Sequence, residues 1–172
     1  IKKGDNLLLG PDLNGNFTPT RIRSIHNDYR YEITSLPKGV RGCLAIQPKV
    51  DIHVKRSMIL APSIPNQVCK KFIADVKIYH HPTTINPGYN VMMHVGALRQ
   101  PCILTNIYPA KTAIDLILKD LDQYASPNQP AKQTEIHVQS GQQYRFVFMF
   151  QTGIHYLTPG RLIFREGSVR GV

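Results

Sequence analysis

The sequence predicts an all-β fold made of two small antiparallel β-barrels with one inserted helix. Short apolar runs recur at spacings of roughly 8 to 12 residues, with turn residues between them, as in small barrels. Pro62 and Pro65 remove backbone donors and stiffen the chain between two sets of such runs, which favours a domain boundary there. Only residues 113–124 have apolar residues at the spacing of a helix.

The first predicted barrel covers residues 1–62. Its expected strands are residues 6–9, 20–26, 29–34, 42–47 and 58–61. Residues 10–16, GPDLNGN, are rich in residues that tolerate unusual backbone angles and predict a turn. Within this turn Asp12-Leu13-Asn14-Gly15 matches the short D-x-x-G pattern of GTPases. Asp, Asn and Gly are common in hairpin turns, so we interpret the match as structural.

The second predicted barrel covers residues 63–172. Its expected strands are residues 72–79, 89–95, 103–107, 144–150 and 161–164. Phe146, Phe148 and Phe150 recur with the period of 2 of a strand and therefore share one face. This aromatic face is expected in the core of the second barrel.

A helix with a polar loop is expected as an insertion at about residues 111–133. Ile114, Ile117, Leu118 and Leu121 follow the i, i+3, i+4, i+7 spacing of one helix face. Residues 125–133 are polar, contain two prolines and predict a mobile loop. The apolar helix face either packs onto its own barrel or docks a partner.

The charge balance indicates a polyanionic partner. Lys and Arg number 21 against 11 Asp and Glu, a net charge of +10, and nucleic acid is the first candidate. A solubilising surface charge is the alternative. Arg21 and Arg23 flank Ile22, so both face one side of a strand. They either follow phosphates or protect an edge strand from pairing.

No catalytic constellation is present in the sequence. There is no G-x-x-x-x-G-K-[ST] phosphate loop, no G-x-S-x-G elbow and no pair of carboxylates spaced for acid and base work. His80 and His81 are adjacent and would point to opposite faces of a strand, so no metal site is predicted.

Cysteine usage and hydropathy bear on the compartment. Cys43, Cys69 and Cys102 are odd in number and widely spaced, which indicates buried thiols in a reducing compartment. No apolar run approaches the roughly 20 residues of a membrane span. We therefore expect a cytoplasmic protein without a membrane partner.

Three motifs occur in order in the second half. They are HPTTINPGY at residues 81–89, VGALRQ at 95–100 and LIFREG at 162–167. The first is a rigid turn between two strands, of the kind used for recognition. Together they resemble the third domain of translational GTPases of the elongation factor Tu class, above all the GTP-binding protein 1 and 2 subgroup. Residues 4–12, 24–26 and 58–62 resemble that subgroup's second domain, whereas residues 111–133 have no counterpart.

The resemblance implies a three-domain factor, with a GTPase domain followed by two six-stranded barrels. The chain then corresponds to the barrel pair, with the first strand of the second domain missing. GTP and Mg would bind to the GTPase domain, which lies outside this chain and would be one of its partners. By this resemblance the chain itself holds no cofactor and does not hydrolyse GTP.

The resemblance also assigns candidate RNA-binding residues, since the third domain of the family grips the T stem of tRNA. They are His81, Thr83, Arg99, Arg165, Gly167 and Arg170. An internal pair of Arg165 with Glu166 is the alternative for that arginine. His26 and Arg41 correspond to positions near the acceptor end of tRNA.

Two functions follow as hypotheses. The first is an RNA- and ribosome-facing, tRNA-binding barrel pair of a GTP-binding translation-factor-like protein, acting in tRNA delivery, ribosome rescue or mRNA turnover. The second is a protein-interaction scaffold that couples the GTPase domain to a protein partner.

Overall fold

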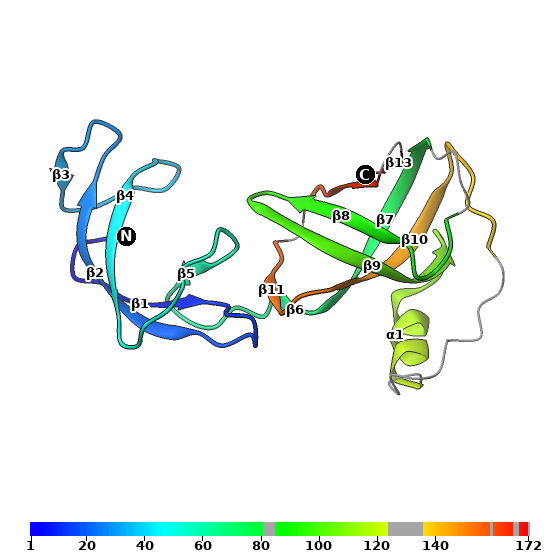
Figure 1. Cartoon of the computed structure of the whole chain (residues 1–172), viewed down its shortest axis with the longest axis horizontal. Helices are drawn as coiled ribbons and strands as arrows, with labels where there is room; N and C mark the ends of the chain where they lie inside the picture. The colour runs from blue at the N-terminus through cyan, green and yellow to red at the C-terminus, as the bar shows by residue number, and fades with distance from the viewer. Residues whose placement is uncertain (81–84, 124–135, 159, 167–168, 172) are drawn as a thin grey trace. The chain divides into compact units, whose positions relative to one another are not determined.

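The computed structural model of the chain describes residues 1–80, 85–123, 136–158, 160–166 and 169–171 (Figure 1). Two compact units are present, one formed by Ile1–Cys69 with Gly153–Leu157 and the other by Lys70–Thr152 with Thr158–Val172. The predicted all-β fold class is confirmed. The predicted domain limits at residues 62 and 63 stay a prediction.

The first unit is built on an antiparallel sheet in the order β3-β2-β1-β5, with β4 also paired to β2. Its strands are β1 (Asn6–Gly10), β2 (Thr18–His26), β3 (Glu32–Ile33), β4 (Cys43–Pro48) and β5 (Ile59–Ala61). A two-stranded sheet is formed by β6 (Val68–Cys69) and β11 (His155–Tyr156). Strands of two residues are too short to show an alternating pattern, so β6 and β11 were not predictable from periodicity.

Strand β2 carries much of the first unit's core. Thr20, Ile22 and Ile25 are buried, whereas Arg21 and Arg23 are exposed. The step from Ile22 to Ile25 is three residues because the register with β4 shifts between Ile22 and Ser24. An irregularity of this kind inserts a residue and moves the following side chains to the other face.

The D-x-x-G match lies in the turn between β1 and β2. The Asp12 carboxylate accepts hydrogen bonds from the backbone N–H groups of Asn14 and Asn16, both at 2.8 Å. These bonds, led by the one from Asn16, lower the pKa of Asp12. The carboxylate therefore holds its own turn, as a structural interpretation requires.

The late segment Gly153–Leu157 packs within the first unit against this turn. The backbone N–H of Ile154 donates to the Leu13 carbonyl at 3.1 Å. Gly153 has a φ of 71°, and a Cβ there would lie 2.8 Å from Leu13 Cδ2. Only glycine combines this left-handed backbone with so close an approach.

The second unit is a closed barrel in the order β10-β7-β13-β12-β8-β9. Its strands are β7 (Lys71–His80), β8 (Asn90–Val95), β9 (Leu98–Pro109), β10 (Gln143–Phe150), β12 (Ile163–Glu166) and β13 (Val169–Gly171). Strand β9 begins five residues earlier than residue 103, where it was predicted, since Val95 pairs with Leu98 across a two-residue turn. Closure leaves this barrel without an open sheet edge.

Aromatic rings fill the barrel. The predicted common face of Phe146, Phe148 and Phe150 is confirmed, because all three side chains are fully buried. Phe148 lies 5.8 Å from Phe164 and 5.6 Å from Phe72 between ring centroids, in tilted arrangements. Such pairs contribute about 0.5–1.5 kcal/mol each beyond the area they bury.

Helix α1 (Ile114–Gln123) follows the end of β9 in the chain (Figure 1). The Arg145 guanidinium binds both carboxylate oxygens of Asp75, at 2.6 and 3.0 Å, and also donates to the Thr112 carbonyl. Arg145 therefore fixes the segment before α1 to the barrel. The predicted loop at residues 125–133 lies outside the described residues.

The apolar face predicted for this helix is only partly covered. Ile117 is fully buried and Leu121 is half-buried, but Ile114 and Leu118 are 50% and 48% exposed. Ile117 is thus the one member of this predicted face that is fully buried.

The prediction of three buried thiols is wrong for Cys43. Cys102 is buried and Cys69 is half-buried, where burial raises the pKa of the Cys69 thiol. Cys43 is exposed, because the outward positions of β4 alternate with its half-buried ones. Among the described residues, no helix is long and apolar enough to cross a membrane.

A buried hydroxyl in β2 gives a stability prediction. Thr20 is 3% exposed, and its hydroxyl has no hydrogen-bond partner among the described residues. We expect Thr20→Val to raise the free energy of unfolding by about 1 kcal/mol, because an unpaired buried polar group is removed. Thr105 is the matched control, since its hydroxyl donates to the Val147 carbonyl at 3.1 Å. Thr105→Val should lower stability by about 1 kcal/mol in denaturant unfolding, and a loss of stability in both variants would contradict the account of Thr20.

Candidate nucleic-acid interface

The strand register of the barrel brings together arginines that are distant in sequence. Arg165 on β12 lies directly opposite Arg170 on β13, and Arg170 lies opposite His80 on β7. On the other side of β12, Arg165 lies opposite Met92 on β8. We call these four positions, which run across four neighbouring strands, the arginine row.

The third predicted arginine lies close to this row. Arg99 on β9 pairs with His94, which is two residues beyond Met92 on β8. The side chains of Arg99 and Arg165 are exposed, whereas Leu98 and Phe164 beside them in sequence are buried. Alternation along both strands thus places these two arginines on the outside of the barrel.

The strand register gives the arginine row two cationic residue types at directly opposed positions, 165 and 170. Like charges at such positions generally disfavour strand pairing. Among the described side chains, neither Arg99 nor Arg165 has a carboxylate partner. An arrangement of this kind is suited to binding an anion such as phosphate.

The remaining predictions for this surface concern residues that follow the row in sequence. His81, Thr83 and Gly167 lie outside the described residues, and for Arg170 only the backbone position is described. His81 directly follows His80, the end of the arginine row.

The acceptor-end candidates are brought together in the first unit. His26 is the last residue of β2 and pairs with Cys43, two residues after Arg41. A Cβ at Gly42 would lie 2.7 Å from the His26 carbonyl oxygen, so glycine is needed for the two segments to approach. His26 is half-buried and Arg41 is exposed.

Lys3, also in the first unit, is paired with a carboxylate. Lys3 Nζ lies 2.7 Å from Glu32 Oε1, and both side chains are about half exposed (51% and 53%). The hydrogen bond and charge of Lys3, with a smaller effect of His26, lower the pKa of Glu32. Lys3 is therefore a weaker candidate for phosphate binding than Arg41.

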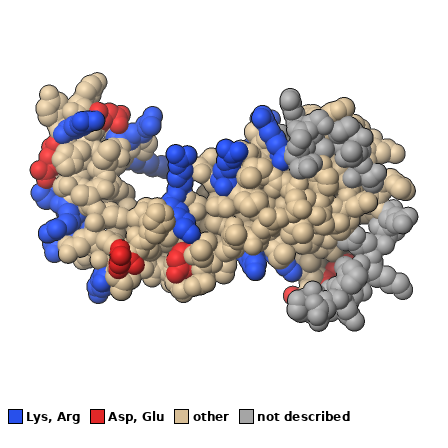
Figure 2. Space-filling model, in the orientation of Figure 1, with Lys and Arg blue, Asp and Glu red and all other residues tan. Residues whose placement is uncertain are grey.

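Arg21 does not protect an edge strand, so that alternative is wrong for this residue. It pairs with Asn6 on β1 and with Gln47 on β4, which places it in the middle of the sheet. These three residues and Lys49 line a hollow of about 490 Å³. On the face drawn in Figure 2, Lys and Arg side chains of the described residues are spread widely, with fewer Asp and Glu.

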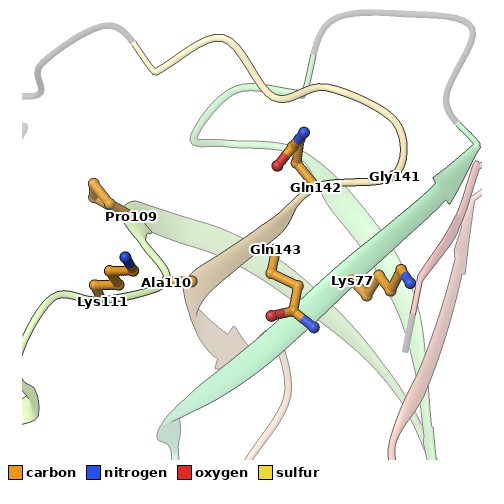
Figure 3. Close-up of a pocket in the computed structure, with 7 residues that line it drawn as sticks. All are labelled: Lys77, Pro109, Ala110, Lys111, Gly141, Gln142 and Gln143. Carbon is orange, nitrogen blue, oxygen red and sulfur yellow. The ribbon is translucent and has the colours of Figure 1, made fainter.

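A second hollow of about 540 Å³ lies at one end of the barrel (Figure 3). The residues that line it include Lys77 from β7, Gln143 from β10 and Lys111 from the segment before α1. None of the predicted site residues lines it. Within the described part of the chain, no group of three His, Cys, Asp or Glu side chains could hold a metal ion.

The loop between β2 and β3 was not predicted from the sequence. A strand was expected over residues 29–34, but only Glu32–Ile33 is a strand. Tyr29 and Tyr31 are instead 81% and 71% exposed. The turn-forming pair Asn27-Asp28 was the signal that a hairpin begins here.

Comparison with known proteins supports the resemblance. The chain is 37% identical over 101 residues to GTP-binding protein 1 of Xenopus laevis, covering 58% of the chain and 15% of that protein. It is 34% identical over 120 residues to elongation factor 1-alpha of Cenarchaeum symbiosum, covering 67% of the chain and 26% of that protein. The chain is homologous to translational GTPases. The resemblance inferred from its motifs is thereby confirmed.

Further matches extend over the whole chain. GTP-binding protein 2 of Mus musculus is 26% identical over 173 residues, covering 99% of the chain and 24% of that protein. The chain thus spans about a quarter or less of the length of these curated relatives. No protein-family model matches it.

Solved structures show the same fold. Sup35 complexed with GDP superposes with a TM-score of 0.70 at 20% identity, over 99% of this chain and 40% of that one. Translation elongation factor SelB from Methanococcus maripaludis gives a TM-score of 0.66 at 20% identity, over 99% of this chain and 35% of that one. The chain is therefore translation-factor-like in fold.

The contact between Lys3 and Glu32 can be tested directly. We expect Lys3→Ala to raise the pKa of Glu32 toward its ordinary value, as measured by NMR titration, because the partner that stabilises the carboxylate is removed. In the wild type the lowered pKa adds stability above the ordinary pKa, and this is lost as the pH falls through the folded-state pKa. Lys2→Ala, at an exposed neighbouring lysine, should leave the Glu32 titration unchanged. An unchanged titration in Lys3→Ala would show that this ion pair does not form in solution.

Proposed function

We propose that the chain is the RNA- and ribosome-facing part of a GTP-binding, translation-factor-like protein, and that it binds tRNA. The arginine row is the observation that carries this proposal. It sets the exposed Arg165 directly opposite a second arginine position in the register, an arrangement that an anion between them would favour, and the backbone of RNA supplies a continuous row of phosphates.

The other parts of the proposal follow from the relatives. In the full-length protein, GTP and Mg would be held by a GTPase domain outside this chain, and the chain would contribute binding without catalysis. That GTPase domain would be its partner within the same protein, and the cytoplasm its location. The names of the relatives, GTP-binding proteins and an elongation factor, support this assignment.

Removing two cations of this surface should weaken RNA binding. We expect Arg99→Ala combined with Arg165→Ala to reduce the affinity of the full-length protein for tRNA by about tenfold, which corresponds to about 1.4 kcal/mol. The slope of log affinity against log salt concentration should also become shallower by about 0.7 to 0.9 for each phosphate that the variant no longer neutralises. Fluorescence anisotropy with labelled tRNA at several salt concentrations measures both quantities.

Lys70 and Lys71 provide the matched control. They are exposed, Lys71 is the first residue of β7 and Lys70 precedes it, whereas His80 is the last residue of that strand. Their replacement by alanine removes the same charge. Affinity and salt slope should stay near wild type in this control. Equal losses in both double variants would mean that net charge, and not the placement of Arg99 and Arg165, determines binding.

A protein-interaction scaffold is the second candidate. The observation in its favour is the exposure of Ile114, Leu116 and Leu118 on α1, at 50%, 58% and 48%. Apolar side chains that stay exposed on a helix are typical of surfaces that dock another protein. Ile114→Asp with Leu118→Asp would then abolish binding of a protein partner and leave tRNA affinity unchanged.

A further inference from the structure

The hairpin of residues 27–31, which joins β2 to β3, presents two tyrosine rings to solvent. Tyr29 and Tyr31 are 81% and 71% exposed, the two largest values among the exposed large hydrophobic residues that are described. Single exposed apolar residues are common on proteins and need no explanation. Two aromatic rings separated by one residue, on a loop of five, are a more specific feature.

This hairpin is held in one conformation by its first residue. The Asn27 side-chain oxygen accepts hydrogen bonds from the backbone N–H groups of Tyr29 and Tyr31, both at 3.0 Å. The Asn27 backbone adds two more bonds, donating to the Tyr31 carbonyl at 3.0 Å and accepting from the Arg30 N–H at 2.9 Å. All four bonds use the backbone of the loop, so the two rings take no part in holding it. The loop is ordered before any ligand arrives, which lowers the entropic cost of binding.

The backbone at Arg30 supports the same conclusion. Arg30 has a φ of 65°, in the left-handed region, and it is the one residue other than glycine with positive φ among those described. Such a conformation is kept where the surrounding structure imposes it, often at sites of binding. Arg30 also supplies a guanidinium group between Tyr29 and Tyr31 in the sequence.

The charges near the hairpin favour an anionic ligand. Residues 26–42 carry two carboxylates, and one of them, Glu32, is already paired with Lys3. The same segment carries Arg30, Lys38 and Arg41, whose side chains are exposed. The pairing of β2 with β4 places the end of β2, where the hairpin starts, close to Arg41.

We propose that the hairpin of residues 27–31 is a stacking platform for unpaired nucleotides of RNA. Aromatic side chains bind single strands because every base has a flat face on which a ring can stack, while neighbouring cations balance the phosphates. A duplex hides those faces, so the platform selects unpaired over paired RNA. This inference rests on the proposed RNA-binding function and deepens it by naming the ligand of the first unit.

The test uses the full-length protein with Tyr29→Ala combined with Tyr31→Ala. The probes are a fluorescein-labelled 12-nucleotide oligouridine and a blunt 12-base-pair RNA duplex, each measured by anisotropy at several salt concentrations. Oligouridine affinity should fall by about thirtyfold or more, because a stacked base is lost with each of the two rings. Duplex affinity should stay constant, and so should the salt slope for oligouridine, since no cation is removed.

Two further variants keep the test independent of folding. Tyr29→Phe with Tyr31→Phe retains both rings and should bind oligouridine within about twofold of wild type. Asn27→Ala retains the rings but removes the acceptor that orders the loop, and should weaken oligouridine binding alone. Thermal unfolding of the tyrosine variants should match wild type, because the rings are exposed.

The outcomes separate this inference from the proposed function. If wild type binds oligouridine and the alanine variant binds it equally well, the platform is wrong although RNA binding stands. Equal losses for oligouridine and duplex, or a loss in the phenylalanine variant, would also overturn it. If the alanine variant keeps oligouridine binding but loses a protein partner, the hairpin is a protein-docking site. If wild type binds neither probe and neither tRNA nor ribosomes, the proposed function itself fails.

Discussion

Burial of the aromatic face of β10 is the constraint on which the arrangement of the second unit depends. Phe146, Phe148 and Phe150 share one face of β10, so a slip of one residue would move all three rings to the other face of the sheet. The same pleat along β12 buries Phe164 and turns Arg165 outward. The place of Arg165 in the arginine row is therefore a consequence of core packing: once Phe164 is inside, Arg165 lies outside, and the register sets it opposite position 170.

Two register shifts interrupt the regular alternation of side chains near the candidate binding residues. The pairing of β13 with β7 shifts between Arg170 and Gly171, so Arg170 lies opposite His80 and Gly171 opposite Ile78, and Tyr79 is passed over. This brings an exposed histidine to the end of the arginine row. In the first unit the shift between Ile22 and Ser24 lets Ile25 rejoin the core and leaves His26 at the end of the strand. Both shifts lie close to a candidate binding residue, where bulges often re-aim side chains.

Sequence reasoning succeeded where a local pattern determines the structure. The period of 2 in residues 144–150 and the helical spacing around Ile117 gave elements close to those observed. It failed where the cause lies far along the chain. The two-residue strand β6 exists because β11, more than 80 residues later, pairs with it, and no periodicity in either strand reports that. The ion pair of Lys3 with Glu32 likewise joins residues 29 apart, so the sequence shows two charges but not their mutual neutralisation.

The candidate site was likewise predicted only in part from the sequence. The resemblance named Arg99, Arg165 and Arg170, but their adjacency comes from strand order, which no single motif encodes. A strand was expected over residues 29–34, where Tyr and Ile favour strands, although residues 29–31 belong to the hairpin. A turn forms there instead, because the Asn27 side-chain oxygen accepts hydrogen bonds from backbone N–H groups of the loop.

Under the proposed function, the two surfaces recognise RNA by different physical means. Arginines on a barrel bind phosphates whatever the bases are, and this attraction falls as salt is added. Tyrosine rings bind the faces of bases, depend little on salt and require that the bases be unpaired. A surface that binds through charge alone would accept any RNA. A surface that binds through stacking alone would accept any unpaired nucleotides. A protein that carries both favours an RNA in which a paired stem and an unpaired segment occur together, which is a narrower set than either surface selects by itself.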